Sequence, residues 1–66
     1  MSSPKLKIGQ VYTNISGLKY ICTDVYGKDA RFTQVDSHWT LVAHSVRMYD
    51  DGRIDWWYST GGHFND

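Results

Sequence analysis

The sequence predicts an all-β fold: a small antiparallel meander of five short strands, closed into a barrel or bent into a strongly curled sheet. Strand-forming Val, Ile, Thr, Tyr and Trp are plentiful, whereas the chain has no Glu, two Ala and three Leu. Apolar and polar residues alternate in short segments, which Gly- and Asp-containing turns separate. The 66 residues suit a single domain, and the 15% aromatic content supplies large side chains for a small core.

Turn residues divide the chain into the five expected strands. Residues 14–17, 27–28, 36–38 and 50–52 contain Asn, Gly, Ser or Asp, which favour tight turns through positive φ angles or hydrogen bonds to the backbone. Residues 1–5 are polar, contain Pro4 and are expected to be loose, so residues 6–64 form the folded part. The expected strands are residues 6–13, 18–26, 30–35, 40–49 and 53–60.

The second and third strands are expected to form a tight hairpin. A glycine that leads a two-residue loop, as Gly27 does, is typical of a type II′ turn. The loop length fixes the register, and the register places apolar pairs on one face and a charged pair on the other. The expected pairs are Val25 with Ala30, Thr23 with Phe32, and Asp24 with Arg31.

The turn at residues 36–38 decides which side of the fourth strand faces the core. A three-residue loop sets Phe32 opposite Val42 and keeps the inner face continuous. Val35, Trp39 and Leu41 then lie outside the core. Either they form an exposed apolar patch, or the sheet bends so that Trp39 turns inward. We favour the bend because small barrels use such corners.

The last two strands flank an Asp-Gly turn at residues 50–52 and organise the rest of the chain. A two-residue loop would mix charged and apolar residues on both faces, whereas a three-residue loop with a left-handed Gly52 separates them. The second register pairs Arg47 with Asp55 on the outer face. Its inner-face pairs are Met48 with Ile54, Val46 with Trp56, and His44 with Tyr58. A short helix at residues 44–49 is an alternative.

The outer face of this hairpin is the candidate binding surface. Trp, Tyr and Arg dominate the energetics of protein interfaces, and this face carries all three. The sequence therefore predicts a protein partner. In two alternatives this face binds no other protein. Either the chain termini cover Trp57, or a homodimer buries Trp57 together with Trp39 and Leu41. The predicted contact residues are Trp57, Arg47, Tyr49 and Arg53, with Trp39 as an addition.

Single-stranded nucleic acid is the second class of partner that the sequence allows. Small β-barrels bind single strands by stacking bases on exposed aromatic residues that basic residues flank. Asp55 opposite Arg47 weakens this interpretation, because phosphate affinity follows the number of basic groups that are free to bind. The formal net charge of zero gives no general attraction to nucleic acid or to an anionic membrane.

No set of residues in the sequence has the pattern of a catalytic, cofactor or metal site. Cys22 lies in the middle of an expected strand and is expected to be a buried thiol. The three histidines lack the spacing of metal ligands. Asp50 and Asp51 belong to a turn, where Asp is favoured for its backbone hydrogen bonds. We therefore expect no enzyme activity, no cofactor and no metal.

The sequence predicts a cytoplasmic protein without a membrane partner. No apolar run approaches the ~20 residues that a membrane-spanning helix needs. The first residues lack the apolar segment of a signal peptide. Cys22 is the single cysteine, which suits a reducing compartment.

Residues 8–12 (Ile-Gly-Gln-Val-Tyr), followed by Gly17 and Tyr20, resemble the first hairpin of SH3-like barrels. The chain also resembles the short, solitary β proteins that bacteriophages and prophages encode. Many of those proteins block host defence or redirect host machinery by binding a protein surface, some anti-CRISPR proteins among them. The resemblance covers residues 6–64 and implies an SH3-like fold and an inhibitor that acts in the host cytoplasm. It includes no diagnostic motif and assigns no functional residue.

Overall fold

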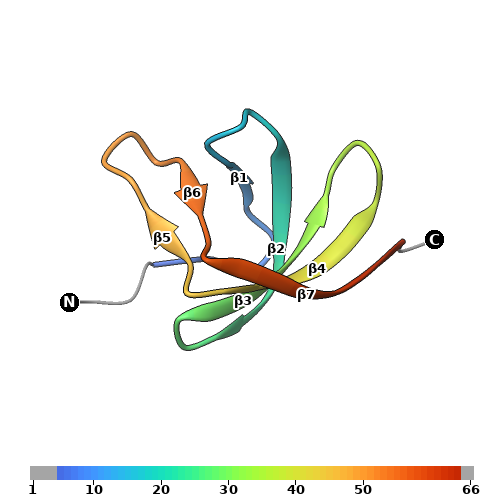
Figure 1. Ribbon diagram of the computed structural model, residues 1–66. Helices are drawn as coiled ribbons and strands as arrows, with labels where there is room; N and C mark the ends of the chain where they lie inside the picture. Colours follow the sequence, from blue (N-terminus) through green and yellow to red (C-terminus); the bar gives the residue numbers. More distant parts are fainter. Residues whose placement is uncertain (1–4, 65–66) are drawn as a thin grey trace.

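The computed structural model describes residues 5–64 as an all-β fold of seven strands (Figure 1). Five strands form one antiparallel sheet in the order β1-β2-β3-β4-β7, and β5 and β6 form a separate hairpin. The sheet curls strongly without closing into a barrel, which confirms the curled-sheet form of the prediction. The strands are β1 (Val11–Thr13), β2 (Lys19–Tyr26), β3 (Asp29–Gln34), β4 (Trp39–His44), β5 (Arg47–Met48), β6 (Ile54–Asp55) and β7 (Tyr58–Phe64).

The first strand is shorter than the sequence suggested. Residues 1–4, expected to be loose, and residues 65–66 lie outside the described part of the chain. Before β1 the chain makes a turn, in which Gly9 has a φ of 89° and the Gln10 N–H donates to the Lys7 carbonyl at 3.2 Å. The predicted strand over residues 6–13 is therefore reduced to residues 11–13.

The β2–β3 hairpin has the predicted register near its turn and a different one farther away. Asp24 faces Arg31 and Val25 faces Ala30, as expected. A bulge between Cys22 and Asp24 then sets Cys22, rather than Thr23, opposite Phe32. The bulge adds one residue to β2, so that the apolar Cys22 side chain points into the core.

The β3–β4 register differs from the prediction by one residue. Phe32 faces Leu41 instead of Val42, because His38 adopts a φ of 61° and its N–H donates to the Gln34 carbonyl at 2.9 Å, which lengthens the loop. A slip of one residue exchanges the two faces of a strand. Leu41 is therefore buried and Trp39 packs against the core. Trp39 was expected to turn inward through a bend of the sheet, whereas the slip in register by itself places it on the inner face.

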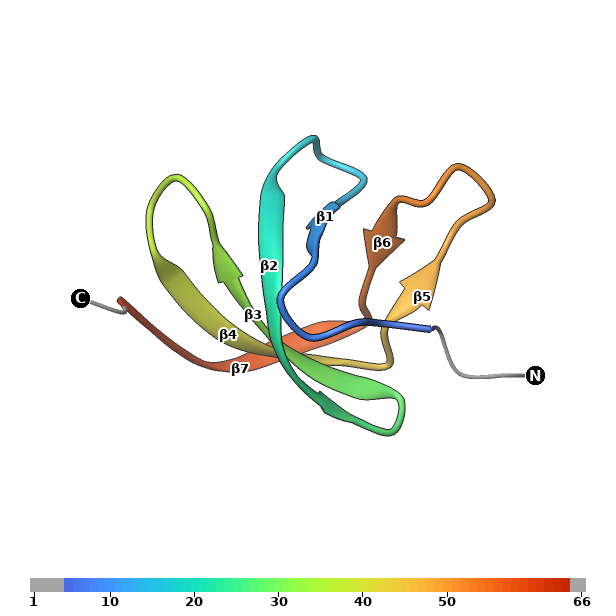
Figure 2. The same cartoon turned by 180° about the vertical axis from the view of Figure 1, so that it is seen from behind.

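Ser45 separates β4 from β5 and breaks the strand predicted at residues 40–49. Its backbone is left-handed, with a φ of 57°, and its N–H donates to the Asp29 carboxylate at 3.0 Å. The β5–β6 hairpin leaves the sheet here and lies beside β1, as Figure 1 and Figure 2 show from opposite sides. Asn14, which follows β1, forms a β-bridge with Ile54 of β6. Residues 44–49 contain no helix, so the helical alternative was wrong.

The core joins the sheet to the hairpin. Val46 and Ile54, from the two sides of the hairpin, are 4% and 0% exposed and point inward as predicted. The half-buried Trp56 ring stacks on Phe32 at a centroid distance of 5.6 Å and meets Tyr20 edge-on at 5.3 Å. These contacts fix the hairpin against the sheet. The buried apolar residues are Tyr20, Cys22, Ala30, Phe32, Leu41, Ala43, Val46 and Ile54.

Candidate functional site

The short β5–β6 hairpin and the residue pair that follows it carry four of the predicted binding residues, Arg47, Tyr49, Arg53 and Trp57. Met48 faces Ile54 in the ladder, which is the register that the sequence predicted. Gly52 has a φ of 89°, and its N–H donates to the Tyr49 carbonyl at 2.9 Å. The Tyr49 N–H in turn donates to the Arg53 carbonyl at 2.8 Å. The turn therefore fixes the backbone of the two residues that flank it.

Both arginines of the hairpin are paired with carboxylates. Arg47 lies opposite Asp55 as predicted, and its guanidinium donates to the Asp55 carboxylate at 3.2 Å. Arg53 approaches Asp51 of the turn at 3.4 Å. More than half of each arginine side chain is exposed, so each pair contributes only about 0–1 kcal/mol to stability. Residues 47–57 contain two arginines and three aspartates, so the hairpin carries a slight excess of negative charge.

Trp57 is the most exposed large apolar side chain on this surface, at 79%. Its backbone is nevertheless held in place, because the Trp57 N–H donates to the His44 carbonyl at 2.9 Å. The preceding residue, Trp56, points the other way and packs into the core. This opposition agrees with the predicted outward position of Trp57. We call the exposed set Arg47, Tyr49, Arg53 and Trp57 the hairpin surface.

His44 lies next to the hairpin surface and links three strands. It faces Tyr58 as predicted, but on the outer face of the sheet, where the two rings stack at a centroid distance of 4.5 Å. The expectation of a core histidine was wrong because the slip in β4 turns His44 outward. Its Nδ1 lies 3.1 Å from the Asp29 carboxylate, and its Nε2 lies 2.7 Å from the Thr60 hydroxyl.

Asp29 anchors the corner from which the hairpin leaves the sheet. One carboxylate oxygen accepts the Ser45 N–H and the other contacts the His44 ring. The hydrogen bond from the Ser45 N–H, followed by the contact with His44, holds the pKa of Asp29 below its ordinary value. The ionised carboxylate therefore supports the backbone turn that positions the hairpin surface.

Trp39 does not join the hairpin surface. It lies at the far end of β4 from His44, roughly 17 Å away along an extended strand of this length. Its ring meets Phe64 edge-on at a centroid distance of 4.9 Å and lies so close to Gly62 that a Cβ there would approach it to 2.3 Å. Trp39 thus packs against the end of β7.

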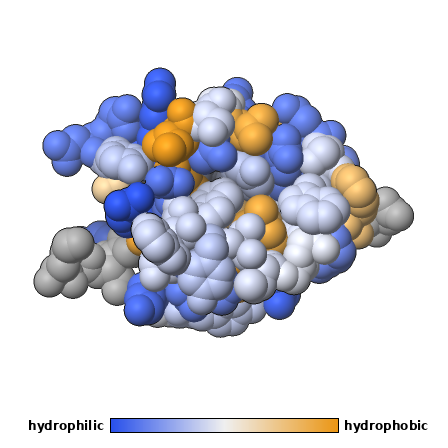
Figure 3. Space-filling model, viewed as in Figure 1, coloured by the Kyte–Doolittle hydropathy of each residue, from blue (hydrophilic) through white to orange (hydrophobic). Residues whose placement is uncertain are grey.

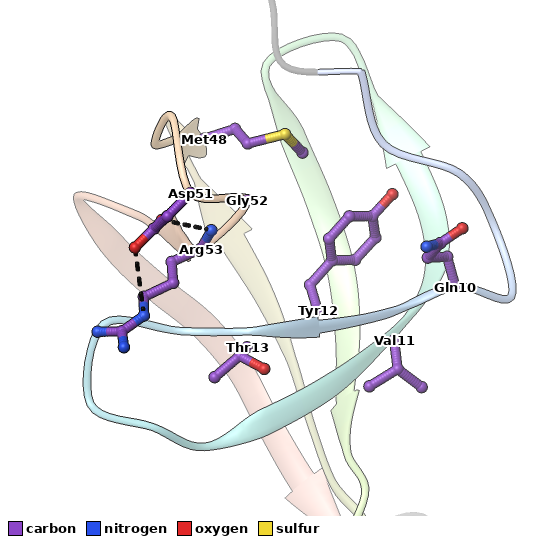
Figure 4. Close-up of a pocket in the computed structure, with 8 residues that line it drawn as sticks. All are labelled: Gln10, Val11, Tyr12, Thr13, Met48, Asp51, Gly52 and Arg53. Atoms are coloured by element: carbon purple, nitrogen blue, oxygen red, sulfur yellow. Dashed lines mark hydrogen bonds and ion pairs between the residues drawn. The ribbon is translucent and has the colours of Figure 1, made fainter.

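A cleft between β1 and the hairpin includes Arg53 of the hairpin surface and adds residues that the sequence did not predict as contacts. Its volume is about 490 Å³. Figure 4 shows the Tyr12 and Met48 side chains entering the space between the two elements, with Arg53 turned toward Asp51. The β-bridge from residue 14 to β6 creates this cleft, and no local pattern in the sequence indicates it. The lining residues are Gln10, Val11, Tyr12, Thr13, Met48, Asp51, Gly52 and Arg53.

The surface around the hairpin is mixed in polarity. Figure 3 shows hydrophobic residues in small separate groups among hydrophilic ones on this side of the molecule. Such a surface suits an interface of aromatic and polar contacts better than a large apolar one.

Two titratable groups lie in the core, the Tyr20 hydroxyl and the Cys22 thiol, and burial raises the pKa of Tyr20. Burial raises the pKa of the Cys22 thiol, which keeps it in its poorly nucleophilic form. Among residues 5–64, no group of three or more His, Cys, Asp or Glu side chains lies close enough together to hold a metal ion.

Comparisons with protein-family models, characterised proteins and solved structures give no match for this chain. No helix capable of crossing a membrane is found in residues 5–64.

Proposed function

We propose that this chain is a non-enzymatic protein-binding module and that the hairpin surface is its contact site. The observation that carries the proposal is Trp57, which is 79% exposed on a fixed backbone. A tryptophan held in this way gains much from removal of water by a partner and loses little conformational freedom, because its side chain has two rotatable bonds.

The charges on the hairpin support a protein partner over a nucleic acid. All three arginines of the chain pair with aspartates: Arg31 with Asp24, Arg47 with Asp55, and Arg53 with Asp51. A phosphate that approached the hairpin would have to compete with these carboxylates. Paired arginines at the rim of an interface instead offer both donors and acceptors to a polar protein surface.

The resemblance to short phage proteins adds a more specific proposal. The partner would be a host protein, such as a component of a defence complex, whose surface the module occludes in the host cytoplasm. No catalytic step is required for this mode of action, because binding alone excludes the partner's own ligands.

The test compares the wild-type chain with two variants, Trp57→Ala and the control Tyr26→Ala. The tagged chain is used to capture its partner from nuclease-treated lysate of cells that express it naturally, and the affinity for the purified partner is then measured by calorimetry. Trp57→Ala is expected to weaken binding by about 30-fold or more, as hot-spot tryptophans do. Tyr26→Ala, which removes an exposed ring from a different hairpin, is expected to leave the affinity unchanged.

Equal affinities for the wild type and Trp57→Ala would remove the hairpin surface from the proposal. Loss of binding on nuclease treatment, together with a steep fall in affinity as salt rises, would instead support a single-stranded nucleic-acid ligand.

A further inference from the structure

β7 presents an open sheet edge. It pairs with β4 on one side, and no strand among residues 5–64 pairs with its other side. All seven of its residues are exposed, and an edge of this length extends roughly 20 Å. The unpaired N–H and C=O groups of such an edge are a template for another strand.

The sequence of β7 lacks the features that usually protect an edge. Tyr-Ser-Thr-Gly-Gly-His-Phe contains no Lys, Arg, Asp or Pro, the residues that commonly prevent pairing between molecules. The opposite edge of the sheet is different, because the β5–β6 hairpin lies beside β1 and bridges to Asn14. One edge of the sheet is therefore covered and the other is open.

The regular part of this edge precedes a bulge. Thr40 faces His63 and Val42 faces Thr60, so β7 has one residue more than β4 over the same interval. Gly61, with a φ of 64°, takes up the extra residue. Because a bulge interrupts the ladder, a new strand would pair most regularly with residues 58–60.

We propose that β7 pairs antiparallel with β7 of a second copy of this chain, with the two-fold axis at Ser59. Each Ser59 then faces its counterpart, and Tyr58 lies opposite Thr60 of the second copy. The edge is suited to itself because it carries no formal charge from Lys, Arg or Asp that would repel an identical strand. The two curled sheets join into one continuous sheet, which removes both open edges.

This dimer differs from the one that the sequence suggested, which buried Trp39, Leu41 and Trp57. Leu41 is already buried within the monomer, with only 7% of its surface exposed, and Trp39 packs against the core of its own chain. Neither side chain is therefore available for contact with a second copy. The inference goes beyond the proposed function, since it requires no other protein.

Sedimentation velocity of the intact chain from about 1 μM to about 1 mM tests the pairing. A concentration-dependent dimer is expected for the wild type. Ser59→Lys places two ammonium groups opposite each other at the axis and is expected to weaken dimerisation at least about tenfold. Ser16→Lys makes the same change in the β1–β2 turn and is expected to have no effect.

A charge swap identifies the axis. Ser59→Asp alone is expected to weaken dimerisation to a similar extent, because two carboxylates then meet at the axis. An equal mixture of Ser59→Lys and Ser59→Asp is expected to form a heterodimer, because opposite charges then face each other. Circular dichroism of each variant at low concentration confirms that it is folded. A wild type that stays monomeric throughout, variants that dimerise like the wild type, or a mixture that does not associate would each overturn the proposal.

Discussion

Adjacent tryptophans with opposite roles give the sharpest stability prediction. Trp56 packs against the core and contacts the Phe32 and Tyr20 rings, whereas Trp57 is 79% exposed. Burial of about 150–250 Å² by a tryptophan corresponds to about 4–6 kcal/mol at 25 cal/mol per Å², an upper bound for a half-buried ring. We therefore expect Trp56→Ala to lower the free energy of unfolding by about 3–5 kcal/mol.

The neighbouring substitution is the matched control. Trp57→Ala removes a ring that water surrounds and is expected to change the free energy of unfolding by less than about 0.5 kcal/mol. Urea titrations followed by far-ultraviolet circular dichroism measure both, since that signal does not depend on tryptophan fluorescence. A chain of this size has about 3–10 kcal/mol of stability in total, so Trp56→Ala should remove a large part of it and lower the urea concentration at the midpoint of unfolding. Similar losses of unfolding free energy for the two variants would refute the assignment of Trp56 to the core side and Trp57 to the solvent side.

Three further predictions follow from single contacts. Asp29→Asn should lower stability near pH 6 in urea titrations. Because the Ser45 N–H holds the pKa of Asp29 below its ordinary 3.8, the wild-type advantage should be complete well above that value and disappear as pH falls through the lowered pKa. Gly62→Ala places a Cβ 2.3 Å from the Trp39 ring and should cost about 1–3 kcal/mol, seen as a lower melting temperature. Arg47→Ala should change the free energy of unfolding by at most about 1 kcal/mol, because its ion pair is exposed.

Local turn chemistry made part of the fold predictable. Gly27 and Gly52 both have positive φ angles, as the predicted turns require, and the pairs next to these turns have the expected register. The contrast between Val46, which points inward, and Trp57, which points outward, also follows from strand alternation. These features depend on neighbours in sequence.

The errors arose where the backbone departs from regular strand geometry. The bulge at Thr23 shifts the β2–β3 register by one residue, so that Cys22 takes the place of Thr23 opposite Phe32. The left-handed His38 shifts the β3–β4 register by one residue, which moves Val42 and His44 to the outer face. Non-glycine residues seldom adopt a positive φ, so the sequence gives little warning of His38 or of Ser45. Each is fixed by contacts that form only in the folded chain.

The cleft could not be predicted for the same reason. It depends on the β-bridge between Asn14 and Ile54, which are distant in sequence, and on the turn that the Asp29 carboxylate stabilises at Ser45. Met48 was expected to face the core, and it instead lines this cleft. Tertiary contacts, rather than local propensity, decided its environment.

The proposed contact site is tested most directly by nuclear magnetic resonance. The isotope-labelled chain is titrated with its purified partner, and changes in the backbone amide signals are mapped onto the structure. The largest changes are expected to cluster at residues 47–57, with the indole N–H signal of Trp57 among them. Changes confined to the β2–β3 hairpin or to the end of β7, with residues 47–57 unaffected, would contradict the proposed contact site.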